Sequence, residues 1–404
     1  MKIKVKDLLV VLIYILIFVA AITHMRFTVV EIRNWIIMYD LALLAAAYLS
    51  VLYFILVLSR KQIKLKVLPV LLFVIVGYEL LTSAFNSMFN IPSIFIHVLP
   101  WPFVFCVFYH YSIDNEIPAC LNLITLFCIS IIFVLAIPNI IKARIFGDGD
   151  AIFTTFYSFA FLPFVYLCCN NKISKIYSII VILLMLFTLK RSAFIIVIVG
   201  NFLYYLLQTY INNSKSKTYT NNSKSKKIKK ILFFFMIVVA FGLAGDYLIE
   251  KFNLPIYERL SNSINDGGSG RLAIWDQVFW YYSNSSTVEK FFGHGFHAVY
   301  YEIQPLGMAR FAHNSFLEIL YDYGILGLTL ILSVFVTILT KTYKMIIEKC
   351  KFAPVMGFAS VSMTVLATIS YFFEVSGLII PFSAVWGLCI GGFARDKKEE
   401  ENES

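Results

Sequence analysis

The sequence predicts an all-α membrane protein whose chain crosses a bilayer many times. Hydrophobic residues make up 60% of its 404 residues and charged residues only 14%, whereas a soluble domain carries about 25% charged residues. Apolar runs recur along the whole chain, each near the ~20 residues that a helix needs to cross a bilayer. Because these runs are continuous rather than alternating, they indicate helices and not the strands of a barrel.

We expect about twelve membrane-spanning helices. The expected spans are residues 8–22, 35–58, 67–88, 93–110, 117–139, 151–168, 174–189, 192–209, 231–249, 313–340, 353–373 and 375–393. The first apolar run follows the segment MKIKVKD and could be read as a signal peptide, but it has no convincing cleavage site of the small-x-small type. We therefore interpret it as the first membrane-spanning helix.

The basic residues predict the orientation of the chain. If the N-terminus lies in the cytoplasm, most of the 34 Lys and Arg residues fall in cytoplasmic segments, which agrees with the inside bias of positive residues in membrane proteins. Both termini are then cytoplasmic. This bias also explains the formal net charge of +10, so the sequence indicates no nucleic-acid partner.

The expected spans divide the chain into four parts. These are membrane-spanning helices one to nine at 1–249, a large outer-face loop at 250–312, helices ten to twelve at 313–393 and a charged cytoplasmic tail at 394–404. The large loop contains a flexible turn, NDGGSGR, and then the segment RLAIWDQVFWYY. Helical spacing places four apolar residues of this segment on one face: Leu272, Trp275, Phe279 and Tyr282. We expect this amphipathic helix to lie at the membrane surface.

Two arginines on the outer face are candidates for binding an anion. Arg191 lies beside Lys190 in TLKRSAF, in a tight turn between the seventh and eighth expected spans. Ionisable groups at membrane depth usually line a cavity or pair with another group, although these two could instead extend to the outer headgroups. Arg271 follows the glycine turn, where a guanidinium can bind a phosphate group through two parallel hydrogen bonds. The alternative role for Arg271 is structural.

The tenth expected span opens with a polar stretch, ARFAHNSFLEILYDYGILGL, at residues 309–328. Its polar residues include Arg310, His313, Asn314 and Glu318. The imidazole of His313, with an unperturbed pKa of about 6.5, can take a proton from a hydroxyl group at neutral pH. The alternative is that His313 and Asn314 only begin the helix, since Asn is a preferred N-cap residue.

These segments together resemble the O-antigen ligase and polymerase superfamily of envelope polysaccharide assembly. The stretch AHNSFLEILYDYGILGL resembles the family's His-Asn signature with its glycine-rich entry into a span, and GSGRLAIW resembles its Gly-Arg-x-x-x-Trp element. FFGHGF resembles the family's Phe-Gly-x-Gly turn, and Arg191 occupies the place of its arginine at the end of a span. The four elements occur in the expected order on one face. The motifs cover only about residues 190–195 and 265–330.

The resemblance implies a metal-independent glycosyltransferase of the GT-C type that needs no cofactor. It implies a bacterial cytoplasmic membrane location, a site facing the exterior or periplasm, and an undecaprenyl-diphosphate-linked oligosaccharide as donor and acceptor. Arg191 and Arg271 would hold the diphosphate, and His313 would orient or deprotonate the acceptor hydroxyl. The residues expected to contact the substrate beside them are Lys190, Arg310, Asn314 and Glu318, the last with a structural alternative. A polysaccharide chain-length regulator is an expected partner by family analogy.

Other polar residues permit further interpretations. Glu79 and Glu374 could pair with Arg191 or Arg271. Asp148-Gly-Asp150 in an outer loop could bind a metal, because other GT-C enzymes use paired acidic residues, but such a sequence is also a common turn. His294, His297 and His313 suggest a zinc site only weakly, because the first two lie in an aromatic glycine turn.

Three functions remain open at this stage. The first is a polymerase that joins lipid-linked repeat units, and the second is a ligase that transfers the finished glycan to lipid A core or to protein. Both use the same donor and the same motifs, and no local feature separates them. The third is a flippase, which needs a polar central cavity and usually internal repeats. The sequence shows no paired half-repeats and gathers its polar groups at the outer rim, so we favour the enzyme, and among the enzymes the polymerase.

Overall fold

The computed structural model is helical wherever it shows regular structure. It describes residues 5–30, 33–58, 67–86, 91–146, 157–188, 191–215, 271–304, 311–370, 372–373 and 375–403, and these contain no strand. Several residues of interest lie outside the described parts: Asp148, Asp150, Lys190, the expected span 231–249, Arg310 and Glu374.

The helices follow the expected spans closely. They are α1 (Val5–Val30), α2 (Arg33–Leu58), α3 (Val67–Phe85), α4 (Ile91–His97), α5 (Pro100–Asp114), α6 (Cys120–Phe146), α8 (Leu162–Cys168), α9 (Asn171–Thr188), α10 (Arg191–Lys215), α13 (Arg271–Asn284), α14 (Thr287–Phe292), the short π-helix η1 (Val299–Ile303), α15 (Ser315–Ile347), α16 (Ala353–Ile369) and α17 (Ser376–Glu403). Eight helical segments among the described residues are long and apolar enough to cross a membrane, and shorter apolar helices accompany them. The prediction of an all-α polytopic membrane protein is confirmed, and the full count of twelve spans stays a prediction.

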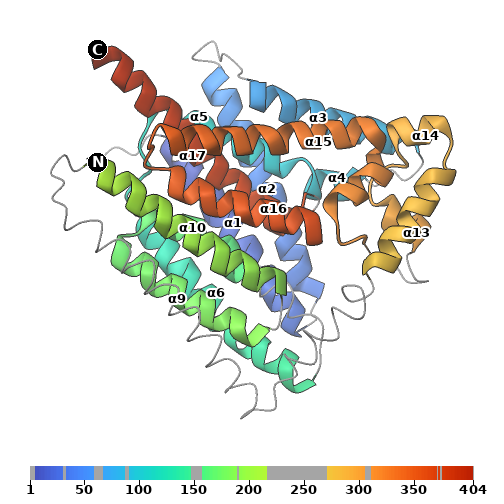
Figure 1. Cartoon of the computed structure of the whole chain (residues 1–404), viewed down its shortest axis with the longest axis horizontal. Helices are drawn as coiled ribbons and strands as arrows, with labels where there is room; N and C mark the ends of the chain where they lie inside the picture. Colours follow the sequence, from blue (N-terminus) through green and yellow to red (C-terminus); the bar gives the residue numbers. More distant parts are fainter. Residues whose placement is uncertain are drawn as a thin grey trace.

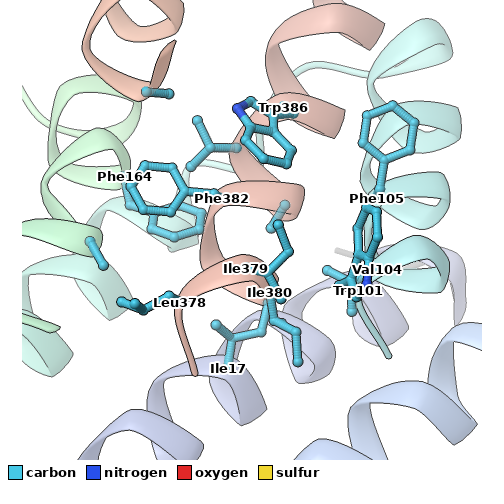
Figure 2. Packing of buried hydrophobic residues seen from close by; sticks show 14 of the residues in the cluster. Ile17, Trp101, Val104, Phe105, Phe164, Leu378, Ile379, Ile380, Phe382 and Trp386 are labelled. Carbon is cyan, nitrogen blue, oxygen red and sulfur yellow. The ribbon is translucent and has the colours of Figure 1, made fainter. Parts of the chain in front are cut away.

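Helix α17 forms the centre of the bundle. It is apolar on all sides over its first turns, as expected for a helix that is surrounded by other helices rather than by lipid. Gly387 and Gly391 let it approach α5 so closely that an added Cβ atom would meet the α5 backbone at Phe105 and Tyr109. Figure 2 shows Trp386 of α17 between the aromatic residues of neighbouring helices. The helix continues without a break to Glu403, so the charged residues of the expected tail extend a membrane helix.

The first helix of the chain, α1, begins at the side of the bundle where the last helix, α17, ends. Lys6 at the start of α1 donates from Nζ to Asn115 Oδ1 at 3.0 Å, and Arg395 near the end of α17 donates from Nη1 to Asn115 O at 2.8 Å. We call this side the terminal end. Helices α13 and α14 lie at the opposite side of the bundle, which we call the loop end (Figure 1). The candidate site residues belong to the loop end.

Helix α13 packs one side against α15 and η1 and leaves the other side exposed. Ile274 and Val278 are buried, whereas Leu272 and Phe279 are each 53% exposed. The four residues predicted to share one membrane face therefore do not all face the same way. Leu272 and Phe279 are exposed, whereas Trp275 and Tyr282 are partly buried against the protein. Exposed apolar side chains continue on α13 and α14: Trp280, Tyr281, Val288, Phe291 and Phe292.

Candidate functional site

The start of α15 holds His313 in an unusual backbone conformation. Asn314 is the N-cap of this helix, and its Oδ1 accepts hydrogen bonds from Phe316 N at 3.0 Å and Leu317 N at 3.1 Å. His313, one residue earlier, has a φ of 54° and is partly exposed. Residues other than glycine rarely adopt this left-handed region, and such residues cluster at functional sites. Asn314 is thus confirmed as a cap, and its contact with a substrate stays a prediction.

Ala312, directly before the histidine, is held from two sides. Its amide donates to Glu318 Oε2 at 2.6 Å, and its carbonyl accepts from Trp275 Nε1 at 2.8 Å. Glu318 is fully buried, which supports the structural alternative for this residue. Trp275 links the Gly-Arg-x-x-x-Trp segment physically to the His-Asn segment. Sequence reasoning missed this role, because it assigned Trp275 to the membrane face of its helix.

Arg271 reaches the end of α16. It is the first residue of α13, and its Nη1 donates to Ile369 O at 2.6 Å, at the last residue of α16. A cation is stabilised there by the negative end of the helix dipole. Three residues beyond Ile369, Phe372 N donates to Ser315 Oγ at 2.8 Å. The end of α16 therefore brings Arg271 and the start of α15 to the same place.

Arg191 begins α10 at about the same level as the end of α16. Helices α10 and α16 run antiparallel, with Phe358 packed on Gly200 and Leu203 and Leu207 packed on Gly357. From the contact between Gly200 and Phe358, Arg191 lies about 14 Å along α10 and Ile369 about 17 Å along α16, at ~1.5 Å per residue. The structure gives the backbone position of Arg191, at the level where Arg271 binds α16.

Three helices thus begin near the end of α16: α10 at Arg191, α13 at Arg271 and α15 at Ser315. The N-terminus of a helix carries a partial positive charge, which favours anions. In α15 the amides of Phe316 and Leu317 already donate to Asn314 Oδ1, so this helix contributes its dipole rather than these two donors. Together with the guanidinium of Arg271 the helix N-termini make this part of the loop end suited to a phosphate-bearing ligand. His313, which lies two residues before the start of α15, has an imidazole that can exchange a proton.

The segment FFGHGF, which contains Gly293 and Gly295, crosses α15 closely at the bend of this helix. Gly293 has a φ of 82° and packs on the backbone of α15, while Gly324 inside α15 has a φ of 66° and packs on the carbonyl of Phe291. Gly295 N also donates to Asp322 O at 2.7 Å. A side chain at either close glycine would collide with backbone atoms, so the two segments can cross only at glycine.

His294 and His297 are engaged within the protein. His294 stacks on Tyr321 at 4.2 Å between ring centroids, and its Nε2 lies 2.9 Å from Ser285 Oγ. His297 packs on Phe296, and burial lowers its pKa to about 3, with His97 acting in the same direction. Within the described part of the chain, no group of three or more His, Cys, Asp or Glu side chains is placed to hold a metal ion. The zinc interpretation of these histidines therefore gains no support.

Part of the chain matches a known protein family. Residues 176–332 match the family model described as O-Antigen ligase. The match places this segment of the chain in the O-antigen ligase/polymerase superfamily. The matched segment contains Arg191, Arg271 and His313, so the resemblance is confirmed over the segments that carried it. No curated protein matches the chain.

Members of this family are glycosyltransferase-like enzymes, and the loop end has groups suited to that chemistry. A cation and helix N-termini can stabilise the negative charge of a departing phosphate group. An imidazole can accept the proton of an attacking hydroxyl. Glu79, the acidic residue expected to pair with one of the arginines, is buried in α3, and its pairing with them stays a prediction.

Proposed function

We propose that this protein is a polysaccharide polymerase that joins oligosaccharide repeat units carried on undecaprenyl diphosphate. The observation that carries the proposal is the convergence of Arg271 and the His313 turn at the end of α16, through the bonds to Ile369 and Phe372. Arg191 begins a third helix at this depth. The family match supports the same class of reaction.

The proposed reaction needs one bond to break and one to form. The bond between the anomeric carbon of the donor glycan and its diphosphate oxygen breaks, and the diphosphate leaves with the electron pair. The oxygen of an acceptor hydroxyl forms the new bond to the same carbon, and its proton passes to His313. Arg271 and Arg191 stabilise the charge on the departing diphosphate.

The depth of the site agrees with a lipid-linked donor. Helix α16 has 17 residues and a length of about 25 Å, which is less than the ~30 Å hydrocarbon core of a bilayer. Our proposal places Ile369 near the boundary between hydrocarbon and headgroups, the level of a diphosphate whose lipid chain is in the membrane. In our proposal the loop end faces the exterior or periplasm of a bacterial cytoplasmic membrane. The ion pairs of Lys351, Arg395 and Lys397 at the terminal end support this orientation.

The alternative is the ligase reaction, which the family match supports equally. A ligase uses the same lipid-linked donor but transfers the glycan to lipid A core or to protein. The site described above serves both reactions, because they differ in the acceptor and not in the leaving group. The two functions therefore have to be separated by their products.

Deletion of the gene, followed by electrophoresis of the cellular glycan, separates them. Loss of a polymerase leaves single repeat units on the final acceptor, which is the expected result. Long chains that remain on the lipid carrier, with none on the acceptor, would show a ligase. Lipid-linked glycan confined to the cytoplasmic side would instead show a flippase and overturn the enzymatic proposal.

We also propose that the reaction needs no metal ion, because Arg271 and the helix N-termini supply positive charge for the leaving group. Glycan extension in isolated membranes should then continue in the presence of a strong chelator. Loss of extension that a divalent cation restores would contradict this part of the proposal and direct attention to Asp148 and Asp150.

A further inference from the structure

An open groove of about 330 Å³ follows one side of α16. Helix α16 lies between α10 and α15 and packs against both (Figure 1). Leu203 of α10 and Leu339 of α15 form its two walls, and Val361 of α16 is part of its floor. The groove therefore runs along the helix whose last residue binds Arg271.

The polar atoms of the groove are satisfied within the protein. Thr342 Oγ1 and Ser360 Oγ share a hydrogen bond of 2.9 Å, and Thr364 Oγ1 donates to Ser360 O at 2.8 Å. These side chains consequently present their carbon atoms to the groove. A sugar or an ion placed here would lose its hydrogen bonds to water without replacement, so the groove suits a hydrocarbon chain.

The groove ends about one helical turn from the candidate site along α16. Val365, which also lines it, is one helical turn from Ile369, the residue that binds Arg271. Val361 lies about 12 Å below Ile369 along α16, at ~1.5 Å per residue. The helices that form its walls begin at Arg191 and Ser315. A lipid chain whose diphosphate lies at the end of α16 would enter the groove directly.

We propose that this groove binds the polyisoprenoid chain of the lipid-linked donor. The inference rests on the proposed function, because it takes the diphosphate to lie beside Arg271. The end of α16 then recognises the head of the lipid, and the side of α16 recognises its tail. Binding of the tail holds the reacting end of the donor at the depth of His313.

Two variants and two ligands test the head and the tail separately. Undecaprenyl diphosphate and geranyl diphosphate share the diphosphate, but a geranyl chain is too short to reach the depth of Val361. Binding of each is measured to the full-length protein in phospholipid nanodiscs. The phospholipid acyl chains of the nanodisc are in excess over the ligand and compete for the groove. A groove that binds any lipid chain would therefore not favour undecaprenyl diphosphate over geranyl diphosphate. Val361→Trp fills the groove, and Val134→Trp makes the same change on α6 at a position that is 68% exposed.

We expect Val361→Trp to lower the binding affinity for undecaprenyl diphosphate at least about tenfold. This is the loss expected when about two methylene groups of the ligand are no longer buried. Geranyl diphosphate should bind this variant as it binds the wild type, which also shows that the variant is folded. Val134→Trp should change neither affinity. If Val361→Trp loses both ligands, Thr364→Phe narrows the same groove with a smaller side chain and should lose only the long-chain ligand.

Arg271→Ala distinguishes a failure of this inference from a failure of the proposed function. It should lower the binding affinity for undecaprenyl diphosphate and for geranyl diphosphate equally, because both ligands carry the same diphosphate group. If Arg271→Ala has this effect and the groove variants do not discriminate between the ligands, the tail site is wrong and the head site stands. If the groove variants discriminate but Arg271→Ala leaves both affinities unchanged, the groove is supported and the diphosphate role of Arg271 is refuted.

Discussion

Replacement of Trp275 by Phe tests whether the contact between α13 and the His313 turn positions the histidine. The indole Nε1 donates to Ala312 O at 2.8 Å, and Ala312 has no exposed surface. Phenylalanine keeps most of the apolar contact of the ring but removes the donor. Water has little access to Ala312, so its carbonyl then lacks this hydrogen bond.

The size of the effect follows from that geometry. Leaving a buried acceptor without its donor costs about 1–3 kcal/mol, so the free energy of unfolding should fall by that amount. If the same loss appears in the transition state through a displaced His313, kcat falls about 5- to 150-fold, whereas KM changes little. Trp275 would then be a positioning residue that acts through Ala312.

The assay is the rate of glycan extension by membranes of a deletion strain that carries each variant, normalised to the amount of protein. Tyr282→Phe is the matched control. Tyr282 lies on α13, as Trp275 does, and its hydroxyl donates a hydrogen bond of 3.1 Å to Lys290 O; the substitution removes this bond but leaves Ala312 untouched. It should lower the unfolding temperature slightly and leave kcat unchanged. Equal rates for Trp275→Phe and the wild type, or equal losses for both variants, would refute the positioning argument.

Three further changes have defined outcomes. Arg271→Lys keeps a positive charge without the two parallel donors of a guanidinium, so glycan extension should fall about 100-fold or more at an unchanged protein level; a near-normal rate would remove the diphosphate role. His313→Ala should lower the rate about 10²- to 10⁴-fold, and normal turnover would reduce His313 to a residue that only begins a helix. Gly293→Ala combines a positive φ with a collision against the backbone of α15 and should cost about 3 kcal/mol of stability, seen as a lower unfolding temperature. Gly77→Ala is the control, because a Cβ atom there meets nothing within 4 Å. This control should not destabilise the protein.

The stability of the loop end should also depend on pH through His297. Burial lowers the pKa of His297 to about 3, below its value of about 6.5 in an unfolded chain. The unfolded chain binds the extra proton first as the pH falls. Stability is therefore constant above pH 6.5 and decreases by up to about 1.4 kcal/mol per pH unit between about pH 6.5 and 3. Thermal unfolding at several pH values should show a shallower decrease for His297→Asn, and an unchanged slope would contradict the assignment.

Local patterns in the sequence predict the membrane helices and the ends of several of them. Hydropathy depends only on consecutive residues, so the expected spans coincide with the helices of the described parts. The cap at Asn314 was predictable for the same reason, since an N-cap side chain bonds to amides within three residues. The order of Arg271 and His313 along the chain predicted the site residues through a family resemblance. The match to residues 176–332 confirms the resemblance, and the roles of the two residues stay predictions.

Contacts between distant segments could not be predicted in this way. The bond from Arg271 to Ile369 joins residues that are far apart in sequence, and neither hydropathy nor helical spacing indicates it. The face of α13 was assigned incorrectly in part, because aromatic residues surround this helix on several sides and weaken its periodicity. Trp275 consequently looked like a membrane contact, although its indole binds Ala312.

The bend of α15 at Gly324 separates the part of the helix that meets lipid from the part that begins at the site. Residues beyond the bend form a rod about 35 Å long at ~1.5 Å per residue, and such a rod adapts to the thickness of a bilayer by changing its tilt. The first turns before the bend are held by Trp275, Glu318 and Phe372 through short hydrogen bonds. A thicker or thinner membrane can therefore alter the tilt of the rod while the turns before the bend keep their place, so the reaction should tolerate changes in lipid composition that alter membrane thickness.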